Sequence, residues 1–479
     1  LQSMERWAGD PLDRQLSLVY LHALFLRSLE EQELLEPAVV REARESLKQA
    51  CAALAIYGGS STGLGRFGTD FGDEVQGAFW LWVLREVARE CPERQAAAQR
   101  LAAWLLGRRD GKGGFQQTSA VAETSEALRR ELADAYITWA LVQSGQKQLE
   151  AECQRIVQLA EQSPDAYMLA LASQVLADTG KTAEAKRLCD RLAKAQAEDG
   201  RLKARAGPRF VGERGLEVES TALAVLAWLR QDGYGEQVRR AVGWMLKQRE
   251  ATGGFGPPHC SATAIRALLG YTQAESQPIK QGKLRIACNG ELVSERPIVV
   301  NHTEPILLEG IQRKLRPGEN RLAFTLSGAD RLPYLLVIRW HSRKPADAGR
   351  CPLRLATELL PERVKLGQTA RLIAEVANTS DQPQAMAVAA LPLPAGLHVE
   401  PTELERLRRC GSVDECRLHA REVICYWRRL APKQKVALQL DLVGAIPGKY
   451  TGQPSRAYCA DCPEAAHWTD PLALEVVRD

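Results

Sequence analysis

In the first part of the chain, apolar residues recur at spacings of three and four, which is the period of an amphipathic helix. Residues 1–275 contain only seven of the 24 prolines. Proline removes an amide that a helix interior needs, so its scarcity also favours helices. The clearest apolar faces comprise Leu132, Ala135, Tyr136, Trp139 and Ala140 in one segment, and Val238, Ala241, Val242, Met245 and Leu246 in another. This part of the chain is therefore predicted to be all-helical.

A short glycine-containing signal with an aromatic residue or leucine at or next to its end recurs between the predicted helices. It occurs at Gly65–Gly68, Asp110–Phe115, Asp199–Leu202 and Thr252–Phe255, with steps of 48 residues from Phe67 to Phe115 and 53 from Leu202 to Phe255. A repeat of about 50 residues holds two helices, and one helix pair cannot bury its apolar face without neighbours. We therefore expect an α/α toroid, with an open solenoid as the alternative. The small number of repeats favours the closed ring.

The pattern changes near Gln277 and Pro278, and residues 276–479 contain the other seventeen prolines. Asn289-Gly290 between two apolar runs predicts a β-hairpin, and further strands are expected through Tyr334–Trp340. Strict alternation over Ala370–Asn378 predicts a half-buried strand of a β-sandwich. The sequence thus predicts a toroid over 1–275, a small antiparallel β module over 278–342 and a β-sandwich over 345–479.

Composition and charge exclude several partners. The formal net charge is +4, from 63 basic and 59 acidic residues, so electrostatics implies no nucleic acid. No run approaches the ~20 apolar residues of a membrane-spanning helix. The start at Leu1 has no signal-peptide pattern, and we interpret the chain as a fragment of a longer product.

Five of the twelve cysteines fall within 53 residues near the end of the chain, which favours an oxidising, extracytoplasmic compartment, secreted or periplasmic. Cys459 and Cys462 could form half of a zinc site with Cys410 and Cys416 as the other half, but structural zinc pairs usually have tighter spacing in both halves, so disulfides are the better explanation. The pairing is open, and Cys425 is the candidate for the odd, buried thiol. The candidate disulfide residues are Cys410, Cys416, Cys459 and Cys462, whereas Cys51, Cys91, Cys153 and Cys189 are expected to be core-facing thiols on helices.

Several motifs together resemble the C-terminal portion of the α2-macroglobulin family, particularly its bacterial members. Val218–Leu226, and Gly253–Phe255 leading to Ala262–Leu268, are similar to the helical thioester domain, and residues 278–342 to the returning half of the CUB-like β domain that carries it. The order of Leu391–Leu397, Val423–Trp427, Leu430–Pro432, Pro447–Tyr450 and Ser455–Tyr458 is similar to the terminal macroglobulin, or receptor-binding, domain. The resemblance spans nearly the whole chain.

Thioester-bearing members of that family carry Cys-x-x-Gln, because thiol and amide must meet across a tight turn. The resemblance aligns this motif with Asp10–Arg14, which places Pro11 at the cysteine position and Arg14 at the glutamine position. The displaced Cys91–Gln95 has the wrong spacing. No histidine lies between His22 and His259 to act in acyl transfer. The resemblance therefore implies a thioester-type domain without a thioester, unless the motif lies upstream of Leu1.

No catalytic residue, cofactor or metal ligand is assigned from the sequence. His259-Cys260 after the Gly-Gly-Phe turn lacks an identifiable third group with an orienting role, so we interpret it as a loop-to-helix entry.

By resemblance, the leading hypothesis is the C-terminal part of a protease-trapping inhibitor that acts without a covalent thioester, with proteases as partners through an upstream bait region. An extracytoplasmic scaffold that has lost inhibition and binds a receptor or another protein is the alternative. A toroid enzyme of the terpenoid cyclase or prenyltransferase kind is disfavoured, since the close aspartates Asp70 and Asp73 are better explained as turn formers.

Overall fold

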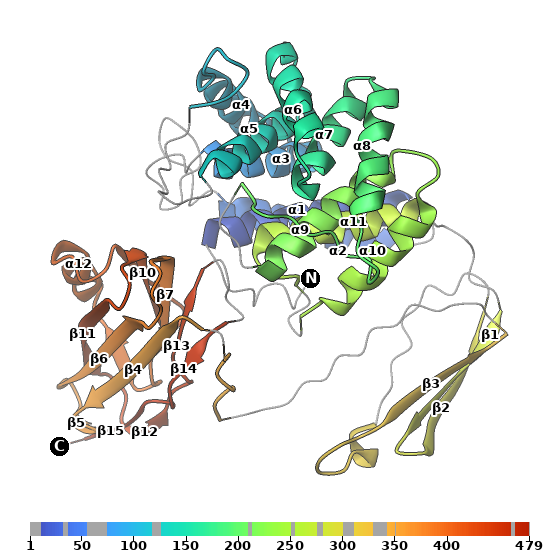
Figure 1. Ribbon diagram of the computed structural model, residues 1–479. Helices are drawn as coiled ribbons and strands as arrows, with labels where there is room; N and C mark the ends of the chain where they lie inside the picture. The colour runs from blue at the N-terminus through green and yellow to red at the C-terminus, as the bar shows by residue number, and fades with distance from the viewer. Residues whose placement is uncertain are drawn as a thin grey trace. The chain divides into compact units, whose positions relative to one another are not determined.

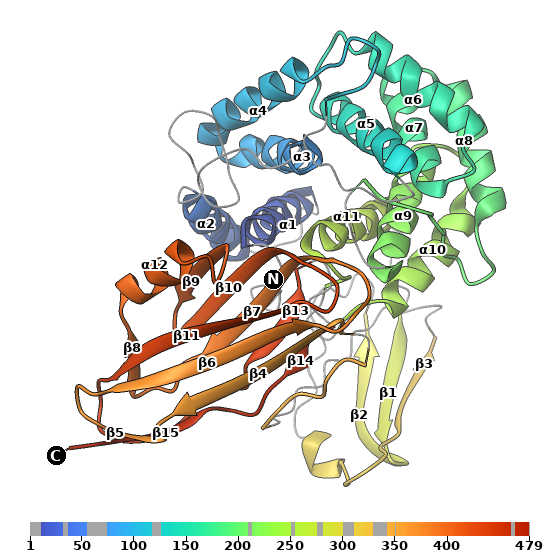
Figure 2. The ribbon, with the colours of Figure 1, turned by 60° about the vertical axis from the view of Figure 1, so that its left-hand side comes forward.

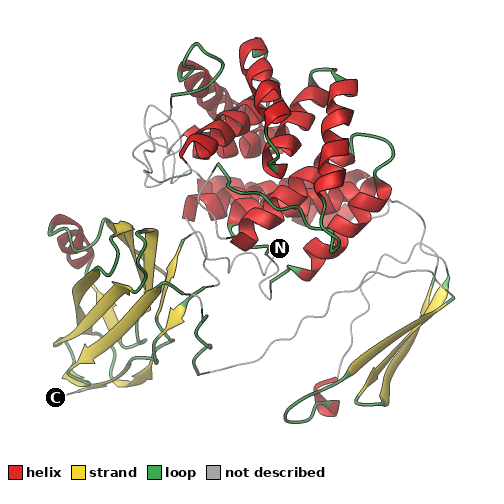
Figure 3. Cartoon of the chain, in the orientation of Figure 1, coloured by secondary structure: helices red, strands yellow, loops and turns green. Residues whose placement is uncertain are grey.

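The computed structural model describes residues 11–31, 37–54, 74–116, 126–208, 213–250, 254–274, 281–299, 311–328, 343–349, 351–460 and 465–478. A helical domain, a three-stranded module and a β-sandwich follow one another along the chain (Figures 1 and 3). Residues 272–340 form a compact unit of their own. The predicted strand Tyr334–Trp340, Asp70 and Asp73 lie outside the described residues.

The helical domain consists of consecutive helix pairs. Its helices are α1 (Pro11–Glu31), α2 (Pro37–Ala53), α3 (Glu74–Glu90), α4 (Gln95–Gly107), α5 (Glu126–Gln143), α6 (Glu150–Gln162), α7 (Ala166–Asp178), α8 (Thr182–Ala195), α9 (Glu213–Trp228), α10 (Gly235–Lys247) and α11 (Pro258–Ala274). None of the described helices is both long and apolar enough to cross a membrane.

Burial separates the helices into two kinds. In α3, α7 and α9 the buried residues form unbroken runs, residues 74–84, 166–176 and 218–225, as expected for helices enclosed on all sides. Helix α8 instead buries one stripe, Ala185, Leu188, Cys189 and Leu192, and α6 and α10 follow the same pattern. Figure 2 shows the result: an inner circle of α1, α3, α5, α7, α9 and α11, with α2, α4, α6, α8 and α10 around it.

The helical domain closes on itself. The inner helices pack in order, α1 on α3, α3 on α5, α5 on α7 and α7 on α9. Arg266 of α11 donates a hydrogen bond to the hydroxyl of Tyr20 in α1 at 2.9 Å, and its guanidinium lies 5.3 Å from the ring centroid of Trp82 in α3. The last helix therefore contacts the first two inner helices. The closed toroid is confirmed, and the open solenoid is wrong.

The described glycine-containing loops share one local geometry, whereas the predicted loop at Gly65–Gly68 lies outside the described residues. One amide donates to the carbonyl four residues later, and the next residue is a buried plug whose own amide donates to a side chain on the following inner helix. In the first of these loops Asp110 donates to Gly114, and the plug Phe115 donates to Asp134. In the second, Ala197 donates to Arg201, and the plug Leu202 donates to Thr221. In the third, Glu250 donates to Gly254, and the plug Phe255 donates to Ser261; all three plugs are buried. The aromatic or leucine signal in the sequence therefore marks a repeated wedge between helix pairs.

The β module has three antiparallel strands, β1 (Gly282–Cys288), β2 (Glu291–Ile298) and β3 (Leu322–Ser327), in the order β2-β1-β3. Cys288 pairs with Glu291, and Asn289 and Gly290 between them have φ values of 52° and 86°. Both positive values are those of the type I′ turn, so the predicted hairpin is confirmed. Its small core comprises Leu284, Ile286 and Ile298, with Phe324 and Leu326 packed against it.

The C-terminal domain is a β-sandwich, as predicted. Its strands are β4 (Leu353–Leu360), β5 (Arg363–Lys365), β6 (Thr369–Asn378), β7 (Gln384–Pro392), β8 (Leu397–Val399), β9 (Glu415–His419), β10 (Glu422–Leu430), β11 (Lys435–Gly444), β12 (Gly448–Thr451), β13 (Arg456–Cys459), β14 (His467–Trp468) and β15 (Ala473–Val477). They form sheets in the orders β14-β13-β7-β10-β9, β4-β6-β11-β8 and β12-β15-β5. One apolar core lies between them, including Leu372, Leu440 and Trp427. A helix that the sequence did not predict, α12 (Pro401–Arg409), lies between β8 and β9.

Candidate functional site

The two positions aligned with the thioester lie in the first turn of α1. Pro11 is its first residue, a place that suits proline because the missing amide needs no partner there, and Arg14 follows three residues later. Their side chains lie outside the described residues. Neither residue type supplies a thiol or an amide. A shift of one residue does not help, since it pairs Leu12 with Gln15, and the Gln15 amide donates to the carbonyl of Ala50 at 3.2 Å.

Inside the ring, the structure brings together three side chains that the sequence analysis did not connect. Glu219 comes from α9, and His259 and Cys260 from the first turn of α11; each is at most 3% exposed. Glu219 Oε2 lies 3.9 Å from His259 Nε2 and 3.8 Å from Cys260 Sγ. The expectation that His259-Cys260 has no third group nearby was therefore wrong.

Local sequence explains why His259 and Cys260 point inward. Helix α11 begins at Pro258, and the Ser261 hydroxyl accepts the amide of Phe255 at 2.8 Å, which fixes the first turn against the plug. Thr263 Oγ1 donates to the His259 carbonyl at 3.0 Å. The imidazole packs edge-on against Phe79 of α3, with ring centroids 6.0 Å apart.

A signal in the repeat could have found the cluster. Thr221 in α9 and Ser261 in α11 both accept the amide of a plug, so they occupy equivalent places in successive repeats. Glu219 and His259 each stand two residues before these acceptors. Aligning the repeats on the acceptor hydroxyl, rather than on the glycines, places both side chains on the same inner level of the ring.

Two tyrosines also lie in this interior. The pKa of the Tyr167 phenol lies well above its ordinary value, mainly because the group is buried and also because Glu219 nearby is negatively charged. Burial raises the pKa of Tyr20 to about 12, with the Arg266 guanidinium opposing the change. Both phenols therefore stay neutral at physiological pH.

The buried carboxylate of Glu219, the imidazole of His259 and the thiol of Cys260 could together hold a metal ion.

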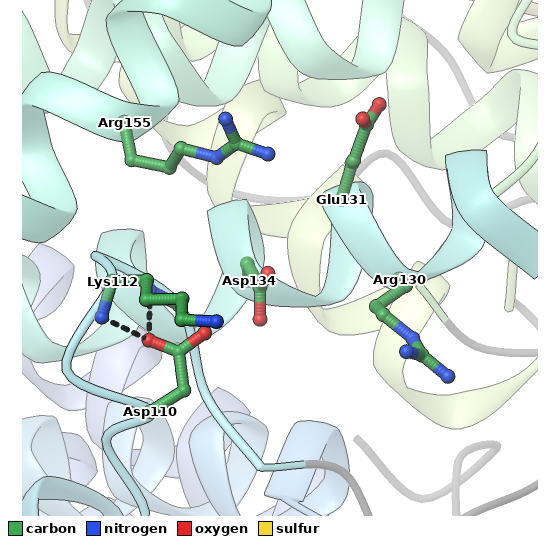
Figure 4. Close-up of a pocket in the computed structure, with 7 residues that line it drawn as sticks. Asp110, Lys112, Arg130, Glu131, Asp134 and Arg155 are labelled. Atoms are coloured by element: carbon green, nitrogen blue, oxygen red, sulfur yellow. Dashed lines mark hydrogen bonds between the residues drawn. The ribbon is translucent and has the colours of Figure 1, made fainter.

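A surface pocket of about 640 Å³ lies where the glycine-containing loop Asp110–Phe115 meets α5 and α6. Figure 4 shows Asp110 and Lys112 of the loop beside Asp134 of α5 and Arg155 of α6. Burial acts to raise the pKa of Asp110, but backbone hydrogen bonds from Lys112 at 2.7 Å and Gly114 at 2.9 Å outweigh it and lower that pKa. Both aspartates thus hold the loop, and the pocket is a product of the plug geometry.

The candidate disulfide cysteines are free thiols where they are described. Cys410 is exposed and lies 3.1 Å from Ser412 Oγ, Cys416 is buried opposite Cys425, and Cys459 donates to Gln384 Oε1 at 3.4 Å. Cys462 lies outside the described residues. Disulfide formation by these residues stays a prediction.

The cysteines of the helices behave as core thiols. Cys51 on α2 and Cys189 on α8 are buried, as predicted, and Cys153 on α6 is partly buried. Cys91 is also buried, but it lies in the connection between α3 and α4 and not on a helix as predicted. Cys51 and Cys91 have their Sγ atoms 2.9 Å apart, a contact that no sequence pattern indicated.

Comparisons with known proteins agree with this fold. The family model of the A-macroglobulin TED domain matches residues 12–271. Ovostatin of Gallus gallus is 23% identical over 275 residues, which are 53% of this chain but 18% of ovostatin. The chain therefore spans well under two thirds of that relative.

Solved structures extend the likeness to the β domains. The crystal structure of native Escherichia coli alpha-2-macroglobulin from domain MG7 to the C-terminus has a TM-score of 0.65 at 13% identity, over 100% of this chain and 74% of that one. Salmonella alpha-2-macroglobulin reacted with methylamine has a TM-score of 0.67 at 12% identity, over 99% of this chain and 30% of that one. With the TED domain model covering more than half of the sequence and the same order of helical and β domains, the chain belongs to the α2-macroglobulin family.

Proposed function

We propose that this chain is the C-terminal part of a protease-trapping inhibitor that retains its target without a covalent thioester. The supporting observation is the combination of a TED domain over residues 12–271 with Pro11 and Arg14 in the first turn of α1. In such a mechanism a protease cuts an upstream bait region, the β domains rearrange, and the enzyme is enclosed. Proteases are then the partners, and the place of action is extracytoplasmic.

The described thiols of the helical domain support retention without covalent capture. Thiolate, not thiol, is the reactive form of cysteine, and it needs an electropositive and partly exposed environment. Cys51, Cys91, Cys189 and Cys260 are at most 2% exposed, and burial raises the pKa of Cys189 to about 11. None of these four is placed to present an acyl group to a trapped protein.

The test uses the full-length product with an added protease. Cleavage should be followed by co-elution of protease and inhibitor in size-exclusion chromatography, and the two should separate completely on a denaturing gel. Methylamine should release no thiol. A matched control is the same protein with its bait cleavage site replaced, which should remain intact and capture nothing.

Two results would contradict the proposal in different ways. A protease adduct that survives denaturation, or one thiol released by methylamine, would show that a thioester exists upstream of Leu1. Binding of one fixed partner with no requirement for cleavage would favour a scaffold that has lost inhibition.

A further inference from the structure

We propose that Glu219, His259 and Cys260 form a binding site for one divalent transition-metal ion of the zinc class inside the helical ring. The three side chains offer a carboxylate oxygen, an imidazole nitrogen and a sulfur, whose ligand atoms all lie within 4.8 Å of one another. The proposal does not depend on the proposed function, because it concerns how the ring is held together.

The spacing of the ligand atoms suits tetrahedral coordination. Zinc binds sulfur at about 2.3 Å and nitrogen or oxygen at about 2.0–2.1 Å, which puts neighbouring ligand atoms of a tetrahedron about 3.3–3.6 Å apart. The distances from Glu219 Oε2 are 3.9 Å to His259 Nε2 and 3.8 Å to Cys260 Sγ. The Glu219 carboxylate needs to approach its two neighbours by a few tenths of an ångström. The ligand atoms of His259 and Cys260 lie within 4.8 Å of each other, so these two side chains must also turn toward each other to complete three corners. A small ligand such as water takes the fourth.

Ligand chemistry and charge point to the same class of ion. Calcium and magnesium take oxygen ligands, whereas a mixed oxygen, nitrogen and sulfur set is typical of zinc, cobalt and related ions. The imidazole binds as a neutral ligand, and binding displaces the proton of the Cys260 thiol to solvent. One carboxylate and one thiolate then neutralise a divalent cation. A neutral cluster is what an enclosed site tolerates, since unbalanced charge there is costly.

The ion would connect α9 to α11, beside the point where α11 closes the ring onto α1. Glu219 comes from one helix and both other ligands from the next inner helix. At 3% exposure or less, the site gives an ion no open path, so loading belongs to folding. The competing explanation is a metal-free cluster in which Glu219 accepts hydrogen bonds from its neighbours.

The experiment refolds the full chain, residues 1–479, from denaturant with Co²⁺ or Zn²⁺ and then removes unbound ion by gel filtration. We expect about one ion retained per chain, and a thiolate-to-cobalt charge-transfer band in the Co²⁺ protein. Cys260→Ser should abolish the band. Cys189→Ser, a matched buried thiol in the same domain, and Cys459→Ser, in the terminal domain, should both keep it.

X-ray absorption on the Zn²⁺ protein does not depend on whether the variants fold. One sulfur in the first shell with nitrogen and oxygen neighbours supports the site, whereas two or more sulfurs would overturn it and place the ion elsewhere, at Cys51 and Cys91 or among the C-terminal cysteines. No ion retained by the unaltered chain would overturn the proposal, and so would a charge-transfer band that survives in folded Cys260→Ser.

Discussion

Substitution of Gly200 by alanine tests the geometry of the loop that places the buried Leu202 between helix pairs. Gly200 has a φ of +100°, and a Cβ built there would lie 2.2 Å from the carbonyl oxygen of Arg240 and 2.5 Å from its carbonyl carbon. Both atoms belong to the backbone of α10, so no side-chain rotation relieves the contact. The loop or the helix has to move.

The cost in unfolding free energy has two parts. An L-residue in the left-handed region loses ~1–2 kcal/mol. Forcing apart a packed contact adds ~1–3 kcal/mol, so Gly200→Ala should cost ~2–5 kcal/mol in total. Gly233→Ala is the matched control, because its φ of +98° imposes the same strain while nothing lies within 4 Å of the added Cβ. That variant should lose only ~1–2 kcal/mol.

Denaturant unfolding of the full chain, followed by far-UV circular dichroism to report on the helices, measures both variants. The transition of Gly200→Ala should occur at clearly lower denaturant than that of Gly233→Ala. Equal shifts in the two variants would refute the reasoning, because the close approach to Arg240 would then contribute nothing. A Gly200→Ala protein as stable as the parent would refute the loop geometry itself.

Three further outcomes follow from individual contacts. Tyr20→Phe leaves the partly buried Arg266 guanidinium without this acceptor across the ring closure, and should cost ~1–3 kcal/mol in the same unfolding assay. Hydrogen bonds from Arg371 lower the pKa of Asp441, so this pair stabilises the sandwich above the unfolded pKa of ~4 and loses that effect as the pH falls through the folded pKa. Unfolding of Asp441→Asn and of the parent should therefore be compared between about pH 6 and pH 3. The difference in unfolding free energy should be no more than ~1 kcal/mol, because both side chains are exposed. Cys410 is exposed and its pKa is lowered by hydrogen bonds from Ser412, so iodoacetamide should modify it before any buried described thiol; mass spectrometry that finds it modified only after reduction would instead support the disulfide prediction.

The ring itself was predictable because its signals are local. A glycine loop followed by an aromatic residue or leucine marks each plug, and Leu202 and Phe255 are at most 2% exposed as that pattern requires. Asn289-Gly290 likewise specifies its turn through backbone conformation alone. In both cases the residues that carry the signal are the residues that make the structure.

Contacts between distant repeats could not be predicted in this way. Tyr20 and Arg266 are separated by 246 residues, and only closure of the ring brings them together. His259 and Cys260 gave no third partner because Glu219 lies 40 residues before His259 on another helix, where the sequence does not distinguish it from Glu213 and Glu217. Helix α12 was not predicted for a different reason. Its nine residues bury only Leu404 and Leu407, and two buried positions are too few to show a helical period.

The positions of the cysteine thiols and their solvent exposure bear on what the helical domain does in this chain. By resemblance, the thioester cysteine of this family aligns with the first turn of α1. Pro11 stands at the aligned position. Among the described thiols of the domain, Cys51 contacts Cys91 and Cys260 contacts Glu219, whereas Cys153 is partly exposed. Burial raises the pKa of Cys189 to about 11 and so keeps that thiol protonated as well. Under the proposed function, capture of a target therefore depends on movement of the domains rather than on a bond that the ring forms.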